Sequence, residues 1–167
     1  MKRLFVVFAL LLVTPAFAAE SAKEHSKPIA GPPIFERLKG LVGEWQSTEK
    51  GMEQCTTSFE LVANGSALME RLSPMAGVVM VNAYHPDGDA VVMTHYCATG
   101  NQPRMRCTKD GSSLAFAFSD ITNWKKGESR MSGVTVTLVD ADHMKQEWVS
   151  DEGEGKGTMT MEFARKK

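Results

Sequence analysis

The residues best able to do chemistry are concentrated in one short stretch, between His95 and Cys107. A turn centred on Gln102 would make this stretch a hairpin and would place Cys97 opposite Cys107. Alternation along the two strands would then put an imidazole, two thiols and a thioether on one face. Because these groups together favour soft ions such as Cu(I), one hypothesis is a copper site. Its ligands would be His95, Cys97, Met105 and Cys107.

The same pairing also predicts a disulfide, which is a structural alternative to the metal site. Residues opposite each other on antiparallel strands have Cβ atoms about 4.5–5.5 Å apart, near the separation that a bridge needs. A bridge between Cys97 and Cys107 would leave Cys55 as a third, buried thiol, and pairings through Cys55 stay open. Haem, with a histidine such as His95 as its ligand, is a further alternative cofactor.

A second group of candidates consists of polar residues in stretches that are otherwise apolar. A polar side chain inside a folded domain needs a hydrogen-bond partner, which a ligand, another side chain or a trapped water can supply. The interior candidates are Glu70, Asn82, Tyr84, Gln146 and Trp148, and His95 of the hairpin is a further candidate for ligand binding. Asn101, Gln102 and Arg104 follow Gly100, where they would either rim a binding site or only form a turn. A ligand could take its polar contacts from both sets.

Catalysis is a less favoured hypothesis. The sequence has no G-x-S-x-G elbow, and the glycines at 153, 155 and 157 are not followed by the helix of a phosphate-binding loop. An acid or base would have to be Glu70, His95 or His143, and their spacing adds no support. Zinc held by a C-x-x-C pair is excluded, since the sequence contains no such pair. We therefore assign no catalytic residue and no required cofactor.

The elements that position these residues are mostly strands. A 3.6-residue apolar period over 34–42, behind two prolines, predicts one short helix. After Gly43 the period changes to two, interrupted by turn pairs such as Asn64-Gly65 and Asp87-Gly88. The predicted strands are 44–50, 52–62, 66–72, 78–85, 90–97, 104–109, 112–118, 131–139, 143–150 and 158–164.

This pattern predicts an all-β fold. Eight to ten strands joined by tight turns form a meander, and a meander removes its exposed edges by closing into an up-and-down antiparallel barrel. An open sandwich of two sheets is the alternative.

The start of the chain has the features of an export signal. Lys2 and Arg3 precede ten apolar residues, 4–13, and a small-x-small cleavage site follows at 16–18. The apolar run is half of the roughly 20 residues that span a bilayer, so we expect a signal peptide rather than an anchor. We therefore predict a signal peptide at 1–18, a flexible leader at 19–33, a single domain at 34–167, and a periplasmic or secreted protein.

Charge and composition restrict the partners. The 167 residues include 19 basic and 20 acidic side chains, for a formal net charge of -1. No basic excess is present to neutralise a phosphate backbone, which argues against nucleic acid as a partner. No apolar run after the signal is long enough to insert stably in a membrane.

The step from helix to first strand, residues 38–45, carries a Gly-x-Trp motif at Gly43 and Trp45. It resembles the calycins, the group of lipocalins and fatty-acid-binding proteins. The resemblance implies that Gly43 makes the turn and that Trp45 plugs one end of the barrel. The longer pattern at 59–61, 65–70, 80–87 and 94–105 looks like a family of exported bacterial lipocalin-like barrels with no assigned activity. That resemblance covers most of 35–149 and implies a calycin-like barrel.

The hypothesis that best combines these observations is an exported, lipocalin-like barrel that binds a small hydrophobic or amphipathic molecule without a covalent bond. One alternative is an envelope protein that holds copper or haem on the hairpin between His95 and Cys107. Another is a filled structural or stress-related barrel without a ligand.

Overall fold

A computed structural model describes residues 30–153 and 155–167. The predicted signal peptide lies outside the described residues, as does the predicted leader as far as residue 29. Among the described residues, no helix has both the length and the apolar character to cross a bilayer.

Ten strands form the body of the molecule, close to the predicted positions. They are β1 (Gly43–Ser47), β2 (Thr56–Val62), β3 (Ala67–Met75), β4 (Val78–Asp87), β5 (Ala90–Tyr96), β6 (Gln102–Cys107), β7 (Ser113–Thr122), β8 (Arg130–Leu138), β9 (His143–Glu152) and β10 (Gly155–Arg165). A single 3-10 turn, η1 (Ala63–Gly65), joins β2 to β3, and helix α2 (Pro33–Lys39) precedes β1.

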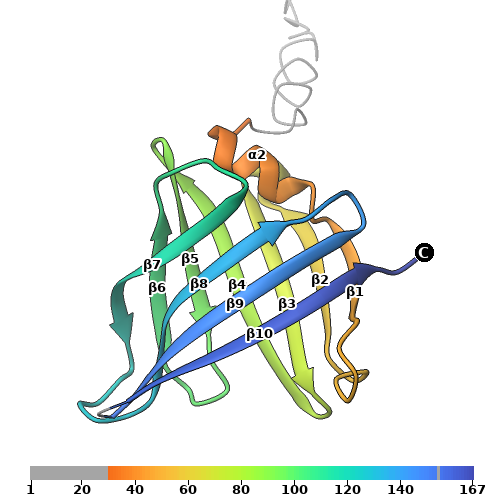
Figure 1. Ribbon diagram of the computed structural model, residues 1–167. Coiled ribbons are helices and arrows are strands. Elements are labelled where there is room, and N and C mark those ends of the chain that lie inside the picture. The colour runs from red at the N-terminus through yellow and green to blue at the C-terminus, as the bar shows by residue number, and fades with distance from the viewer. Residues whose placement is uncertain (1–29, 154) are drawn as a thin grey trace, which may run out of the picture.

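The strands close into one antiparallel barrel (Figure 1). Each strand pairs with its neighbours in sequence, and β1 completes the ring by pairing with both β2 and β10. The predicted up-and-down, calycin-like barrel with one short helix is therefore confirmed, and the sandwich alternative was wrong. Closure gives every strand two hydrogen-bonded neighbours, which satisfies the backbone groups that an open sheet would leave exposed.

Alternation along the strands fills the barrel with side chains. Leu114 and Phe116 on β7 are buried while the alanines between and beyond them are exposed, as the two-residue period predicts. Tyr84 on β4 packs edge to face against Phe116, with the ring centroids 5.6 Å apart. Methionines from several strands complete the core, including the fully buried Met93, Met105 and Met161. Most of the barrel interior is thus a conventional apolar core.

Helix α2 covers one end of the barrel, which we call the closed end (Figure 1). Pro33 begins the helix, at a position where an N–H would have no partner within the helix. The helix buries the side chains of Ile34, Phe35 and Leu38. Trp45 lies just inside this end, is fully buried, and donates its indole N–H to the carbonyl of Leu41 at 2.8 Å.

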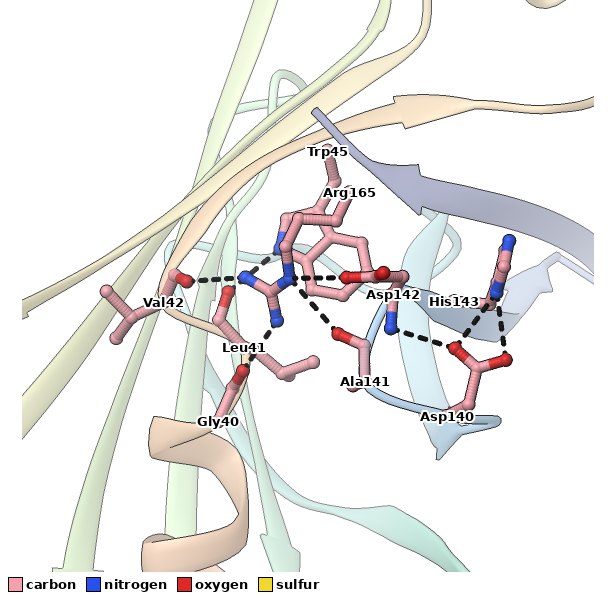
Figure 2. Close-up of polar contacts among 9 residues, drawn as sticks. All are labelled: Gly40, Leu41, Val42, Trp45, Asp140, Ala141, Asp142, His143 and Arg165. Carbon is pink, nitrogen blue, oxygen red and sulfur yellow. Dashed lines mark hydrogen bonds and ion pairs between the residues drawn. The ribbon is translucent and has the colours of Figure 1, made fainter. Parts of the chain in front are cut away.

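Arg165, near the end of β10, holds the closed end together (Figure 2). Its guanidinium lies 4.2 Å from the centre of the Trp45 ring and donates to the carbonyls of Gly40, Val42 and Ala141 at 2.7–3.1 Å. Gly43 has φ +128°, and a Cβ at that position would lie 2.9 Å from Nη1 of Arg165. The Gly-x-Trp motif therefore makes room for this arginine.

The predicted register of the hairpin between β5 and β6 was wrong. The loop is shorter than expected, because Cys97 accepts a hydrogen bond from the N–H of Gly100, whose φ is +87°. A glycine at positive φ completes a three-residue hairpin loop, so the turn is centred on Thr99 rather than Gln102. Cys107 consequently lies opposite Val91, not Cys97, and all three cysteines of the chain are free.

Candidate functional site

The centre of the barrel contains a buried carboxylate, Glu70, whose side chain is completely shielded from solvent. Its two oxygens accept four hydrogen bonds from neutral groups at 2.7–2.9 Å. The donors are the hydroxyls of Thr57 and Tyr84 and the side-chain amides of Asn82 and Gln146. Such donors replace the water that the carboxylate loses on burial.

Register explains why these residues meet. On β3 and β4, Glu70 lies directly opposite Asn82, and on β4 and β5, Asn82 lies directly opposite His95. All three side chains face inward because the alternation that buries Leu68 and Leu72 on β3 also buries Glu70. A line of polar groups therefore crosses three neighbouring strands inside the barrel.

This line fixes the protonation of His95. Glu70 Oε2 accepts a hydrogen bond, so the Asn82 side chain must point its amide nitrogen toward Glu70. The other end of that amide, Asn82 Oδ1, then lies 2.6 Å from His95 Nδ1. Nδ1 must therefore carry the proton, and Nε2 is left as a lone pair. Burial lowers the pKa of His95 to about 4, so the ring is neutral at neutral pH.

A second branch of the network reaches β9. Gln146 donates to Glu70 and accepts the indole N–H of Trp148 at 3.0 Å. The Trp148 ring packs against His95, with the ring centroids 5.0 Å apart. Burial, followed by the charge of Glu70, raises the pKa of Tyr84 well above its usual value, so this hydroxyl stays a donor. We call these seven residues the Glu70 network: Thr57, Glu70, Asn82, Tyr84, His95, Gln146 and Trp148.

The end of the barrel opposite helix α2, which we call the open end, holds a hollow of about 500 Å³. Its lining residues come from the loop that joins β7 to β8 and from the hairpin of β9 and β10. Both connections lie at the end of the barrel away from helix α2 (Figure 1). Trp124, Lys126, Glu128, Arg130, Asp151 and Lys156 line it together with three glycines.

Arg130 organises one wall of this hollow. Its guanidinium lies 3.9 Å from the centre of the Phe118 ring and 5.4 Å from that of Trp124. It also pairs with Asp151 at 2.9 Å, and Trp124 is fixed by its indole N–H, which donates to the carbonyl of Glu128. The hollow therefore presents an ordered aromatic ring beside charged groups.

Asn101 is connected both to the loop of the hollow and to the segment that follows His95. Its side chain is 1% exposed, and its amide donates to the carbonyl of Ser129, which stands between the hollow residues Glu128 and Arg130. The backbone carbonyl of Asn101 accepts from Cys97, two residues beyond His95 along the chain. This places Asn101 nearer the open end than His95 is.

The predicted ligand-binding residues separate into two groups. Six of them come together in the network, and Asn101 is also buried; the six are Glu70, Asn82, Tyr84, His95, Gln146 and Trp148. Gln102 and Arg104 instead bond to β7: Gln102 accepts from Thr122, and Arg104 pairs with Asp120 at the surface. Their interactions are with the neighbouring strand rather than with the interior.

Sequence reasoning missed Thr57 and the hollow. Thr57 is buried on the same face of β2 as Phe59, but it follows another threonine, Thr56, which is only partly buried. The sequence alone does not say which of the two threonines faces inward. Trp124 and Arg130 lie at the two ends of the loop between β7 and β8, where no periodicity operates. The sequence signal that could have indicated this site is Trp124, a large aromatic residue in a loop that is otherwise rich in charged residues.

The predicted copper ligands are not assembled into one group. Met105 lies opposite Met93, and Cys107 lies opposite Val91, so both are displaced along the barrel from His95 toward the closed end. In residues 30–153 and 155–167, no set of three or more His, Cys, Asp or Glu side chains is arranged to hold a metal ion. The sulfur pair that does form is another one, in which the Cys55 thiol donates to Met161 Sδ at 3.6 Å.

Comparison with known proteins adds no assignment. No family model matches this chain, and no curated protein matches it. The class of protein is therefore defined by the structure itself: a closed, ten-stranded, calycin-like barrel with a polar network in its core.

Proposed function

We propose that this protein binds a small amphipathic molecule, without a covalent bond, at the open end of its barrel. The observation that carries the proposal is the hollow of about 500 Å³ beside Trp124 and Arg130. Its volume is in the range of pockets that hold small organic ligands, about 300–1,000 Å³. An aromatic ring for an apolar body, next to charged side chains for a polar group, suits an amphipathic ligand better than a purely apolar one.

The proposed setting is the periplasm, and this rests on the sequence of residues 1–18. We further propose kinship with the calycins, supported by the up-and-down barrel and by Gly43 and Trp45 at its closed end. Amino-terminal sequencing of protein isolated from the cell envelope should begin at Ala19. An intact Met1 would contradict the export proposal.

Native mass spectrometry of the mature protein, purified from its own envelope, tests ligand binding directly. We expect an organic mass that is retained in the native spectrum and lost on unfolding. Copper or haem released in its place would support the metal-binding alternative instead. A bare polypeptide that also fails to bind an added probe would contradict the proposal and favour a filled structural barrel.

A suitable probe is 1-naphthol, which has an apolar body and one hydroxyl group. Equilibrium dialysis should show saturable binding that weakens about tenfold or more in Trp124→Ala, because the aromatic wall of the hollow is lost. Tyr96→Ala is the matched control, since Tyr96 is an exposed aromatic residue on β5 outside the hollow. Equal weakening in both variants would show that the probe binds elsewhere.

A further inference from the structure

Two buried polar atoms in the described part of the chain have no hydrogen-bond partner: His95 Nε2 and Asn101 Oδ1. Both residues are almost completely buried, at 0% and 1% exposed. A buried polar atom without a partner is unusual in native proteins, since the water it has lost is not replaced. These two atoms are therefore the places where the interior is chemically incomplete.

Both atoms are hydrogen-bond acceptors, and the network determines this. Glu70 fixes the orientation of the Asn82 amide, so Asn82 Oδ1 accepts a hydrogen bond from the Nδ1–H of His95. His95 Nε2 therefore has no proton and carries a lone pair. The amide nitrogen of Asn101 donates to the carbonyl of Ser129, and its Oδ1 has no partner. A group that completes the site must bring donors, not acceptors.

We propose that His95 Nε2 and Asn101 Oδ1 form an acceptor site that selects ligands with a neutral hydrogen-bond donor, a hydroxyl or an amide N–H. This inference rests on the proposed function and specifies the ligand class. It assigns the network a role in specificity: Glu70 and Asn82 do not touch the ligand but set the polarity of the atom that does.

Register makes the two residues neighbours inside the barrel, because Asn101 pairs with Cys97, two residues beyond His95 along the chain, and both His95 and Asn101 are buried. Asn101 is bonded to the loop that lines the hollow, and Trp148 packs against His95. On β9, Trp148 is three residues from Asp151 of the hollow wall, a distance of about 10 Å along a strand. His95, Asn101 and Trp148 do not line the hollow itself, so a ligand that reaches the acceptors has to extend inward past the wall of the hollow.

The same arrangement disfavours other head groups. A carboxylate would bring a negative charge and further acceptors close to the buried charge of Glu70. An ether has no proton to give and would leave both atoms without a partner.

Matched probes test the selection. 1-Naphthol and 1-methoxynaphthalene share the apolar body and differ by one donor. Equilibrium dialysis of the intact mature protein should give at least tenfold tighter binding of 1-naphthol, because the ether leaves a buried acceptor unpaired. Equal binding of the two would overturn the inference and leave the proposed function standing. Binding of neither would count against the proposed function, and the inference would fail with it.

Variants on one strand separate His95 from its surroundings. His95→Phe keeps a ring and removes Nε2, so the preference for 1-naphthol should fall to less than about threefold. Tyr96→Phe, the next residue on β5 with an exposed side chain, is the control and should keep the full preference. A preference that survives in His95→Phe would show that another group receives the hydroxyl.

Nitrogen-15 NMR of the unmodified protein gives a readout that does not depend on a variant folding. The His95 Nε2 resonance should be that of a free lone pair before addition and should move on saturation with 1-naphthol, but not with 1-methoxynaphthalene. A resonance that is already hydrogen-bonded without ligand, and that 1-naphthol leaves unchanged, would identify a resident water and overturn the inference.

Discussion

At the scale of single residues, the core of this barrel holds a carboxylate by neutral dipoles instead of by an ion pair. The four hydrogen bonds that the Glu70 oxygens accept come from hydroxyl or amide groups. Each donor is itself on a strand, so the network joins β2, β3, β4 and β9 across the interior. The paired carboxylate favours one arrangement of the core, because another arrangement would leave Glu70 or one of its donors without a partner.

Replacing Glu70 by Gln tests this pairing. The new amide nitrogen faces a donor whichever way it turns, Gln146 on one side or Asn82 on the other. We expect the free energy of unfolding to fall by about 1–3 kcal/mol, the cost of a buried polar group without a partner. Urea unfolding measures it. Glu60→Gln, at an exposed position on β2, should change the midpoint little; equal midpoints for the two variants would contradict the role of the network.

His95 should make the protein less stable in mild acid. Burial holds its pKa near 4 in the folded state, against 6.5 when it is unperturbed. Between these values the unfolded chain binds a proton that the folded chain does not, so stability falls as pH decreases from about 6.5 to 4. The expected loss is about 3 kcal/mol over the whole window.

Urea midpoints at pH 7, 6 and 5 measure this slope before most carboxylates titrate. His95→Gln, which cannot take up a proton in this range, should show a flatter profile than the parent protein. Identical slopes in the two proteins would show that another group causes the loss.

The cysteines should differ in reactivity. Burial raises the pKa of Cys55 to about 11, with smaller contributions from the charges of Glu49 and Glu70, and burial also raises the pKa of Cys107. Cys97 is only partly buried. Because the thiolate is the reactive form, N-ethylmaleimide should modify Cys97 first and the other two only after unfolding. Peptide mass mapping over time identifies the order, and early labelling of Cys55 would contradict it.

At the scale of elements, the closed end depends on one side chain from the last strand. Arg165 connects β10 to the turn after α2 through Gly40 and Val42, and to the loop between β8 and β9 through Ala141. Three chain segments far apart in sequence therefore share one guanidinium. The planar group can do this because its donors diverge in fixed directions while its face rests on Trp45.

Arg165→Met should destabilise the protein by about 2–3 kcal/mol, since it leaves several carbonyls without their charged donor. Arg104→Met is a matched control, because Arg104 pairs with Asp120 at the surface, where an ion pair contributes about 0–1 kcal/mol. Thermal unfolding of both variants beside the parent protein measures the difference. Equal shifts would show that Arg165 contributes no more than a surface charge.

The strands could be predicted from sequence because their signal is local. A two-residue apolar period and glycine-rich turns locate β7 and β10 without knowledge of their partners. Register is not local: the pairing of β5 with β6 depended on whether Thr99 or Gln102 occupied the centre of the turn between them. A shift of the turn moved Cys107 away from Cys97 without changing which face either occupies.

The candidate site was predicted in part for the same reason. Glu70 and Asn82 could be recognised as inward polar residues, because each interrupts an apolar period. The sequence could not show which of these residues are hydrogen-bond partners of one another. That depends on contacts between distant positions, such as Gln146 and Glu70, which are 76 residues apart. The two atoms that lack partners became visible only when all the other partners were known.

At the scale of the whole molecule, the two ends of the barrel are different. Helix α2, Trp45 and Arg165 cover one end with apolar packing and shared hydrogen bonds (Figures 1 and 2). The other end carries the hollow and the buried acceptors of His95 and Asn101. We therefore expect substitutions at the closed end to alter stability more than affinity for the proposed ligand.

The closure of the ring also has a kinetic consequence. The contact between Arg165 and Val42 spans 123 residues, and contacts of such long range form late because the intervening chain must first be ordered. Until β10 docks, β1 and β9 each present an unpaired edge on which another copy could add a strand. The arrival of β10 therefore ends the period in which the folding chain is most prone to aggregate, and slowing that step should lower the yield of folded protein before it lowers the stability of the finished barrel.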